Sequence, residues 1–180
     1  MQPVLICDIM ENILLWKGRV MKKYRCKKTI STMLVFLWVG LIFSFSSQEA
    51  EQSAELSMGL LQGILKILEG LPLPQELNAF DWHWMIRKSA HFAEYFILGF
   101  LGLNALGYWD NSRKRKLLLT LGFSLLVAGC DEYYQTFVPG RSGQGMDVLI
   151  DGIGSTFGLL FYSLYDFLKK RKSIPEKRLV

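Results

Sequence analysis

The stretch TISTMLVFLWVGLIFSFS, from Thr29 to Ser46, decides the class of fold. Its 18 residues carry no charge, which is close to the minimum length for a helix that crosses a bilayer. Three further apolar runs follow at 86–109, 116–130 and 148–168. A soluble domain of this size would alternate polar and apolar residues at short periods instead. The sequence therefore predicts an all-α membrane protein with four transmembrane helices.

The charged residues divide the chain into three parts. We expect a basic N-terminal segment at 1–28, a four-helix membrane domain at 29–168 and a basic tail at 169–180. Met21, followed by two lysines, is an alternative translation start to Met1. The order of basic, apolar and small residues there also resembles a signal peptide. Because more apolar segments follow, we interpret the first run as a retained anchor.

The orientation follows from the basic residues, which fall in three blocks on one side of a four-span topology. The blocks are 17–28, 113–116 and 169–178. The positive-inside rule makes that side cytoplasmic, so we expect a multi-pass protein of the cell membrane with both termini in the cytoplasm. The blocks account for the net charge of +5. Because they abut spans and do not form one groove, no nucleic-acid partner is indicated.

The loop between the first two spans, 47–85, contains a second kind of helical pattern. Apolar residues recur there at helical spacing, and Glu51, Glu55 and Lys66 fill the other faces. This pattern predicts an extracytoplasmic amphipathic helix that lies on the outer leaflet or caps the bundle. Its apolar residues are Met58, Leu61, Ile64, Leu65, Leu68 and Leu71.

Small residues form one face of the last span. Gly154, Ser155 and Gly158 lie within about one turn of each other. Glycine weakens helices in water, but in a bilayer small residues let helix backbones approach closely. We therefore expect this face to pack against another span.

Polar and charged residues gather at the segments that the topology places at the outer face. Residues spaced by three and four lie on one side of a helix, so several of them face the same way. Placing ionisable groups at membrane depth costs free energy, and such groups usually have a function. As catalytic candidates we take His91, Glu94, Glu132 and Asp147; as substrate-binding candidates we take Arg87, Lys88, Tyr95, Asp131, Gln135, Arg141 and Asp151.

Two interpretations of these charges stay open. In the first they are structural ion pairs, with Arg87 or Lys88 bound to Glu94 and Arg141 bound to Asp147. In the second, His91 is a base or nucleophile among cations and carboxylates.

The sequence specifies no cofactor, and it contains no recognised metal-binding motif. Its carboxylates are nevertheless suited to binding a divalent cation. The candidate ligands for such an ion are Asp131, Glu132, Asp147 and Asp151.

These residues also fall into ordered motifs. They are Phe45-Ser46-Ser47-Gln48, Arg87-Lys88-x-x-His91-x-x-Glu94-Tyr95, Asp131-Glu132-x-x-Gln135-x-Phe137-x-Pro139-Gly140-Arg141 and Asp147-x-x-x-Asp151-x-x-Gly154. In order and spacing they resemble the VanZ-like family, over roughly 29–168. Relatives carry Asn or Asp at the position of Asp151, so this chain does not depart from the pattern there. The resemblance implies a cell-envelope protein linked to low-level resistance to the glycopeptide teicoplanin.

The resemblance further implies similarity to membrane enzymes that act on lipid head groups, including phosphatidylserine synthases. Two hypotheses follow. One is an enzyme that transfers or hydrolyses head groups of phospholipids or polyprenyl-linked glycan precursors at the outer leaflet. The other is a non-catalytic membrane protein that binds such a lipid, or the lipid tail of a drug, and alters envelope properties. The expected partner in both is a membrane lipid or lipid-linked phosphate, and the sequence does not specify an oligomeric state.

Overall fold

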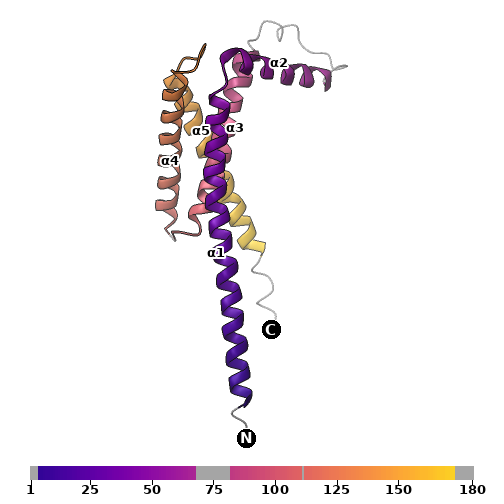
Figure 1. Cartoon of the computed structure of the whole chain (residues 1–180), viewed down its shortest axis with the longest axis vertical. Coiled ribbons are helices and arrows are strands. Elements are labelled where there is room, and N and C mark those ends of the chain that lie inside the picture. The colour runs from indigo at the N-terminus through magenta and orange to yellow at the C-terminus, as the bar shows by residue number, and fades with distance from the viewer. Residues whose placement is uncertain (1–3, 68–81, 111, 173–180) are drawn as a thin grey trace.

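The computed structural model describes residues 4–67, 82–110 and 112–172, and the regular structure in these ranges is entirely helical. The helices are α1 (Val4–Ser46), α2 (Ala50–Ile67), α3 (Trp82–Leu106), α4 (Arg113–Gln135) and α5 (Gly145–Lys172). Helices α1, α3, α4 and α5 form a bundle, whereas α2 points away from it (Figure 1). The expectation of an all-α fold is confirmed for the described residues.

The bundle has two chemically different ends. At one end α1 and α4 finish while α3 and α5 begin (Figure 1). We call it the cluster end because the polar and charged candidate residues of these four helices lie there. At the basic end, α4 begins with the basic block at 113–116 and α5 finishes with the block at 169–172. Helix α1 begins on that same side and extends well beyond the other helices (Figure 1). It runs through the expected boundary at residue 28 without a break.

In the described part of the chain, three helices are long and apolar enough to cross a membrane. They are Met21–Ser46 of α1, Arg113–Gln135, which is α4, and Gly145–Arg171 of α5. Four were expected. The remaining bundle helix, α3, carries His91, Glu94 and Asn104 within its apolar stretch, and these residues lower its hydropathy. The structure thus indicates a membrane-embedded protein in which α3 differs from its three neighbours.

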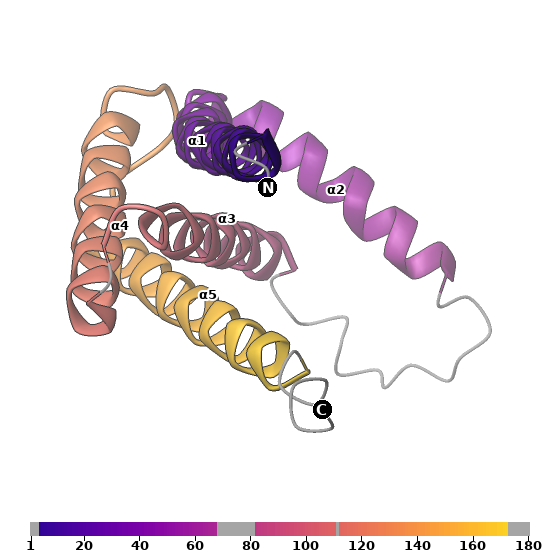
Figure 2. The same cartoon turned by 90° about the horizontal axis from the view of Figure 1, so that it is seen from below.

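Helices α3 and α5 form the most extensive contact of the bundle. The small-residue face of α5 makes this possible, because a side chain at Gly154 or Gly158 would collide with the backbone carbonyls of Phe92 and Phe96 on α3. The expected role of this face in helix packing is confirmed. The two helices lie side by side in both views, with α1 and α4 on other sides of α3 (Figure 2).

The surface of the bundle is apolar and much of its interior is polar. Large side chains such as Leu118, 71% exposed, and Phe36, 66% exposed, point outward. Among the described residues, 12 polar or charged side chains are buried, against 10 hydrophobic ones. The hydrophobic core is small and includes Ile42, Tyr95 and Leu98. Such an arrangement suits a lipid surrounding, where outward apolar side chains need no protection from water.

Helix α2 lies within the loop where an amphipathic helix was expected. It begins at Ala50 and ends at Ile67, and it lies crosswise to α1 (Figure 1). Met58 and Leu56 are exposed on it. The expected apolar positions Leu68 and Leu71 lie outside the described residues. The existence of a helix here is confirmed, and its contact with a leaflet stays a prediction.

Candidate functional site

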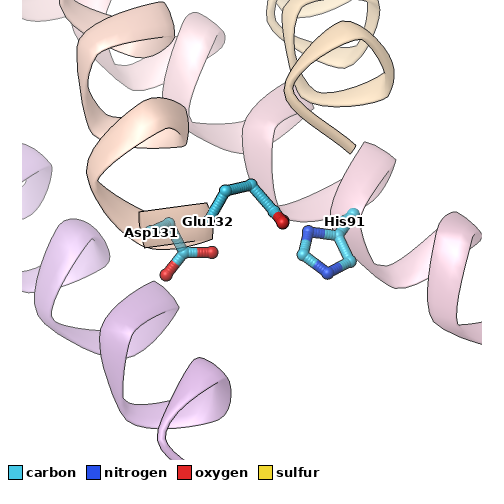
Figure 3. A group of neighbouring side chains, drawn as sticks. All are labelled: His91, Asp131 and Glu132. Carbon is cyan, nitrogen blue, oxygen red and sulfur yellow. The ribbon is translucent and has the colours of Figure 1, made fainter. Parts of the chain in front are cut away.

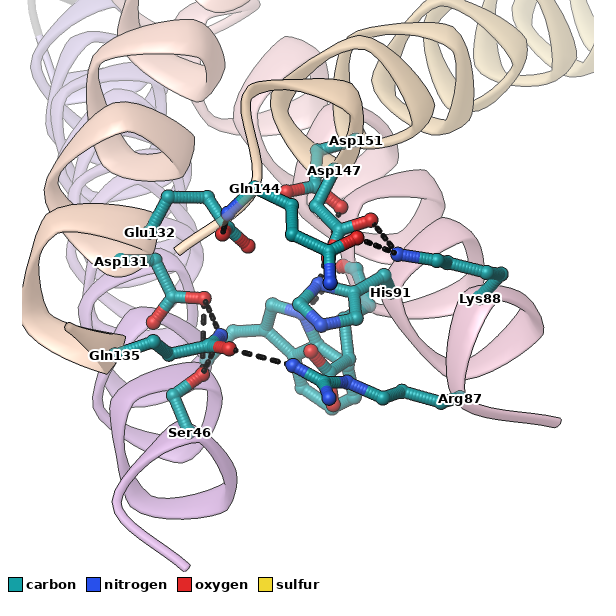
Figure 4. Close-up of polar contacts among 12 residues, drawn as sticks. Ser46, Arg87, Lys88, His91, Asp131, Glu132, Gln135, Gln144, Asp147 and Asp151 are labelled. Carbon is teal, nitrogen blue, oxygen red and sulfur yellow. Dashed lines mark hydrogen bonds and ion pairs between the residues drawn. The ribbon is translucent and has the colours of Figure 1, made fainter. Parts of the chain in front are cut away.

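The polar side chains of the cluster end come from all four bundle helices (Figure 4). Residues one turn apart share a helix face, so the first turns of α3 and α5 and the last turns of α1 and α4 each supply several groups to one place. Most of them are buried. The residues are Ser46 on α1, Arg87, Lys88 and His91 on α3, Asp131, Glu132 and Gln135 on α4, and Asp147 and Asp151 on α5.

One chain of hydrogen bonds joins α1, α3 and α4. Arg87 Nη2 donates to Gln135 Oε1 at 3.0 Å. Gln135 Nε2 in turn donates to Asp131 Oδ2 at 3.1 Å and to Ser46 Oγ at 3.3 Å. Ser46 donates its hydroxyl to the same Asp131 oxygen at 2.9 Å. The carboxylate of Asp131 is therefore held through a single oxygen.

A second group of contacts joins α3 to α5 and to the loop before it. Lys88 Nζ forms an ion pair with Asp147 Oδ1 and donates to Gln144 Oε1 at 3.2 Å. The backbone N–H of Gln144 donates to Glu132 Oε2 at 2.7 Å. Because Asp147 has no exposed area, this ion pair lies inside the bundle. Gln144 thus ties a carboxylate on α4 to the cation on α3.

His91 lies between these two groups. Its Nδ1 is 3.4 Å from Asp151 Oδ1, a contact that lacks hydrogen-bond geometry. The imidazole also faces Asp131 and Glu132 (Figure 3), and one ligand-type atom from each of the three residues lies within 4.8 Å of the others. His91 is 5% exposed. Burial opposes a charge on this imidazole, whereas the surrounding carboxylates favour one.

A cavity of about 350 Å³ lies beside His91, between α1, α2 and α3. Phe45, Leu56 and Ile86 give it apolar walls. Its polar lining includes four ionisable side chains, namely Arg87, His91, Glu94 and Arg141. The cavity therefore joins an apolar space to the polar cluster.

The loop from 136 to 144 brings Arg141 to this cavity. Gly140 has φ of 72°, a left-handed conformation that favours glycine, and turns the chain just before Arg141. Arg141 Nη2 donates to the backbone oxygen of Phe45 at 3.5 Å. Burial and then the repulsion from Arg87 lower the pKa of Arg141 from its usual value. Two guanidinium groups are thus close to each other at one cavity wall.

A model of the VanZ/LLP1 family matches residues 31–166, which include every side chain of this cluster. The chain belongs to the VanZ/LLP1 family. The resemblance drawn from the motifs is confirmed. Neither the search of curated proteins nor that of solved structures returned a match.

The ion pairs of the VanZ/LLP1 cluster are not the ones expected from the sequence. Lys88 pairs with Asp147, not with Glu94, and Arg87 binds the neutral Gln135. Among the described residues, neither Glu94 nor Arg141 forms a salt bridge. The expected pairs were wrong because they joined neighbours along the chain, whereas the cluster pairs side chains across different helices. These ion pairs therefore do not involve Arg141 or Glu94, and both of those side chains line the cavity.

The candidate residues divide into those that line the cavity and those behind it. Tyr95 has no exposed area and belongs to the core, so it does not line the cavity. Two residues were missed as site candidates, Ser46 and Gln144. Ser46 lies in the first motif, which could have found it. Nothing in the sequence distinguishes Gln144, whose role comes from the loop conformation.

The carboxylates expected to hold a divalent cation do not act together. Asp147 is paired with Lys88, and Asp151 lies against His91. In the described part of the chain, the residues whose ligand atoms come together are instead His91, Asp131 and Glu132. Of the four candidate ligands, Asp131 and Glu132 therefore lie in such a group, together with the imidazole of His91.

Proposed function

We propose that this VanZ/LLP1 protein binds the phosphate-bearing head group of a membrane lipid at the cluster end and transfers or hydrolyses it. The substrate class is a phospholipid or a polyprenyl-linked glycan precursor. One observation carries the proposal: Arg87 and Arg141 line a cavity that has apolar walls and reaches His91. A lipid needs this combination, because its head group is charged while its chains remain in an apolar surrounding.

The two arginines suit a phosphate because each has a donor to spare. Arg87 Nε and Arg141 Nε are buried and have no hydrogen-bond partner among the described residues. A buried donor without an acceptor costs about 1–3 kcal/mol, so an anion that supplies acceptors here is favoured. Guanidinium groups bind phosphate oxygens in pairs, with a planar geometry that lysine lacks.

His91 supplies the acid–base chemistry in this proposal. A hydroxyl group, of water or of an acceptor alcohol, loses its proton to His91 while its oxygen bonds to phosphorus. The bond between phosphorus and the leaving oxygen breaks, and that oxygen takes the proton back from the imidazolium. Asp151, at 3.4 Å, stabilises the imidazolium between the two transfers. The same geometry makes His91 a better base than a nucleophile, because Asp151 favours its protonated form.

The proposal places the cluster end at the outer leaflet. Helix α3 serves as a fourth span that is shielded from lipid on the sides where α1, α4 and α5 contact it. With four crossings and the basic blocks at the other end, the positive-inside rule puts both termini in the cytoplasm. Helix α2, which supplies Ser53 and Leu56 to the cavity, would then lie along the outer leaflet next to the bound lipid.

The test is lipid turnover by the purified protein in nanodiscs, with products identified by mass spectrometry across a panel of phospholipids and polyprenyl phosphates. We expect the wild type to turn over at least one of them. His91→Gln should lower the rate about a hundredfold to ten-thousandfold while lipid binding persists. Arg141→Gln should weaken lipid binding itself. Arg113→Gln, an exposed arginine of the basic end, is the matched control and should change neither.

The outcomes separate the two hypotheses. Turnover that needs His91 supports the enzyme. Binding that needs Arg141, without turnover of any lipid by the wild type, favours the non-catalytic lipid-binding protein. If Arg113→Gln weakens binding as much as Arg141→Gln, the cavity is not the binding site and the proposal is wrong.

A further inference from the structure

The two carboxylates nearest His91 are each used on one side only. Asp131 accepts from Ser46 and Gln135 through Oδ2, and Glu132 accepts from the Gln144 N–H through Oε2. Their other oxygens, Asp131 Oδ1 and Glu132 Oε1, are buried without a hydrogen-bond partner among the described residues. Asp131 has no exposed area and Glu132 has 5%. Both carboxylates are thus anchored, and one ligand-type oxygen from each lies within 4.8 Å of an imidazole nitrogen of His91 (Figure 3).

The charge of the cluster also lacks a counterpart. The carboxylates are Glu94, Asp131, Glu132, Asp147 and Asp151, and the cations are Arg87, Lys88 and Arg141. When all five carboxylates are ionised they face three fixed positive charges, or four when His91 is protonated, so at least one negative charge is uncompensated. Uncompensated charge away from water is costly. It would also repel the phosphate that the arginines are proposed to bind.

We propose that His91, Asp131 and Glu132 bind one divalent cation of the Mn²⁺ or Zn²⁺ type. The inference rests on the lipid-phosphate site proposed above and revises the role of His91 in it, because an imidazole bound to a cation is neutral and would serve as a ligand, while water on the cation would supply the base. Two carboxylates and an imidazole favour these ions over Ca²⁺ or Mg²⁺, which prefer oxygen ligands alone. Ser46, Gln135 and Gln144 hold the ligands in place as outer hydrogen-bond partners, an arrangement common around metal ions. A cation with three protein ligands keeps positions open for a phosphate oxygen or water.

The three ligand atoms must move closer together to share one ion. At metal–ligand distances of about 2.0–2.2 Å, the ligand atoms of a tetrahedral site lie about 3.3–3.6 Å apart. The three candidate atoms lie within 4.8 Å of one another. The Glu132 side chain has flexible bonds and is held only at Oε2, so it can rotate toward the other two ligands.

The first experiment measures Mn²⁺ binding by the full-length protein in a phosphate-free detergent, from the loss of the free-ion signal in electron paramagnetic resonance. We expect one ion per chain. Asp131→Asn and Glu132→Gln should each weaken binding about tenfold or more, since even outer-shell changes cost about 10–100-fold. Asp166→Asn, at the opposite end of α5, is the control carboxylate and should bind as the wild type does. Equal binding by wild type, Asp131→Asn and Glu132→Gln would overturn the inference.

A second measurement does not depend on whether these variants fold. The chain has two histidines, so His83→Gln leaves His91 as the only one. With ¹⁵N-labelled histidine, Zn²⁺ should shift the imidazole nitrogen resonances of this variant. An unchanged spectrum at saturating Zn²⁺ would exclude His91 as a ligand. This measurement contains no phosphate or lipid. A negative result would therefore overturn the metal site without changing the outcome of the lipid-binding test on Arg141→Gln.

Discussion

The ion pair between Lys88 and Asp147 gives the sharpest test of the packing of this cluster. Asp147 has no exposed area, and its Oδ2 has no hydrogen-bond partner among the described residues. Lys88→Met therefore removes the only side-chain contact described for this carboxylate, at Oδ1. Removing one member of a buried pair typically costs about 3–5 kcal/mol, because the other charge stays buried alone. The chain offers a matched control in Lys170 and Asp166, whose side chains are 73% and 41% exposed. Lys170→Met should cost about 0.3–0.5 kcal/mol, as exposed helix pairs do.

The assay is reversible unfolding of the detergent-solubilised protein in sodium dodecyl sulfate, followed by circular dichroism. A double variant, Lys88→Met with Asp147→Leu, removes both charges and should recover most of the stability lost in Lys88→Met. The reasoning is refuted if Lys88→Met costs no more than Lys170→Met. It is also refuted if the double variant is less stable than Lys88→Met alone, since the penalty would then not come from an isolated charge.

Three further predictions concern packing, orientation and resistance. Gly158→Leu should lower the unfolding midpoint because it separates α5 from α3, whereas Gly122→Leu, where a Cβ meets nothing within 4 Å, should not; equal effects would contradict the close approach. In a chain without its three cysteines, Gln62→Cys should react with an impermeant maleimide in intact cells and Lys114→Cys only after lysis; the reverse would invert the proposed topology. Cells that express the wild type should survive higher teicoplanin concentrations than cells that express Arg141→Gln, and equal susceptibility would separate the cavity from resistance.

Much of the fold could be predicted from the sequence because apolar length sets the helices of a membrane protein. The runs at 29–46, 116–130 and 148–168 correspond to α1, α4 and α5, and the small face of α5 predicted close packing. The length of α1 could not be predicted in the same way. Lysine and arginine are good helix formers, so the basic segment ahead of the apolar run does not mark where the helix begins. The start of α1 at Val4 therefore could not be predicted.

The members of the cluster could be predicted from the sequence, but their pairing could not. Periodicity shows which residues share a face of one helix, so His91, Asp131 and Asp147 could all be selected. Which side chains meet depends on the rotation of each helix about its axis and on the loop at 136–144. That rotation places Lys88 against Asp147 and brings His91, not Asp151, to the two carboxylates of α4.

Helix α3 is the bundle helix on which the site depends most. Helix α3 contributes Arg87, Lys88, His91 and Glu94, and it is absent from the three helices apolar enough to cross a membrane. It also contacts every other helix of the bundle, and its contact with α5 is the most extensive. A span with this many ionisable groups is costly in lipid, but the cost falls when its polar face meets polar groups of its neighbours. Helices α4 and α5 supply such groups through Gln135 and Asp147. We therefore expect the insertion of α3 to depend on the assembly of the cluster. Variants such as Asp147→Leu alone, which leave a cation of α3 without its partner, should lower the amount of membrane-inserted protein before they affect any chemistry.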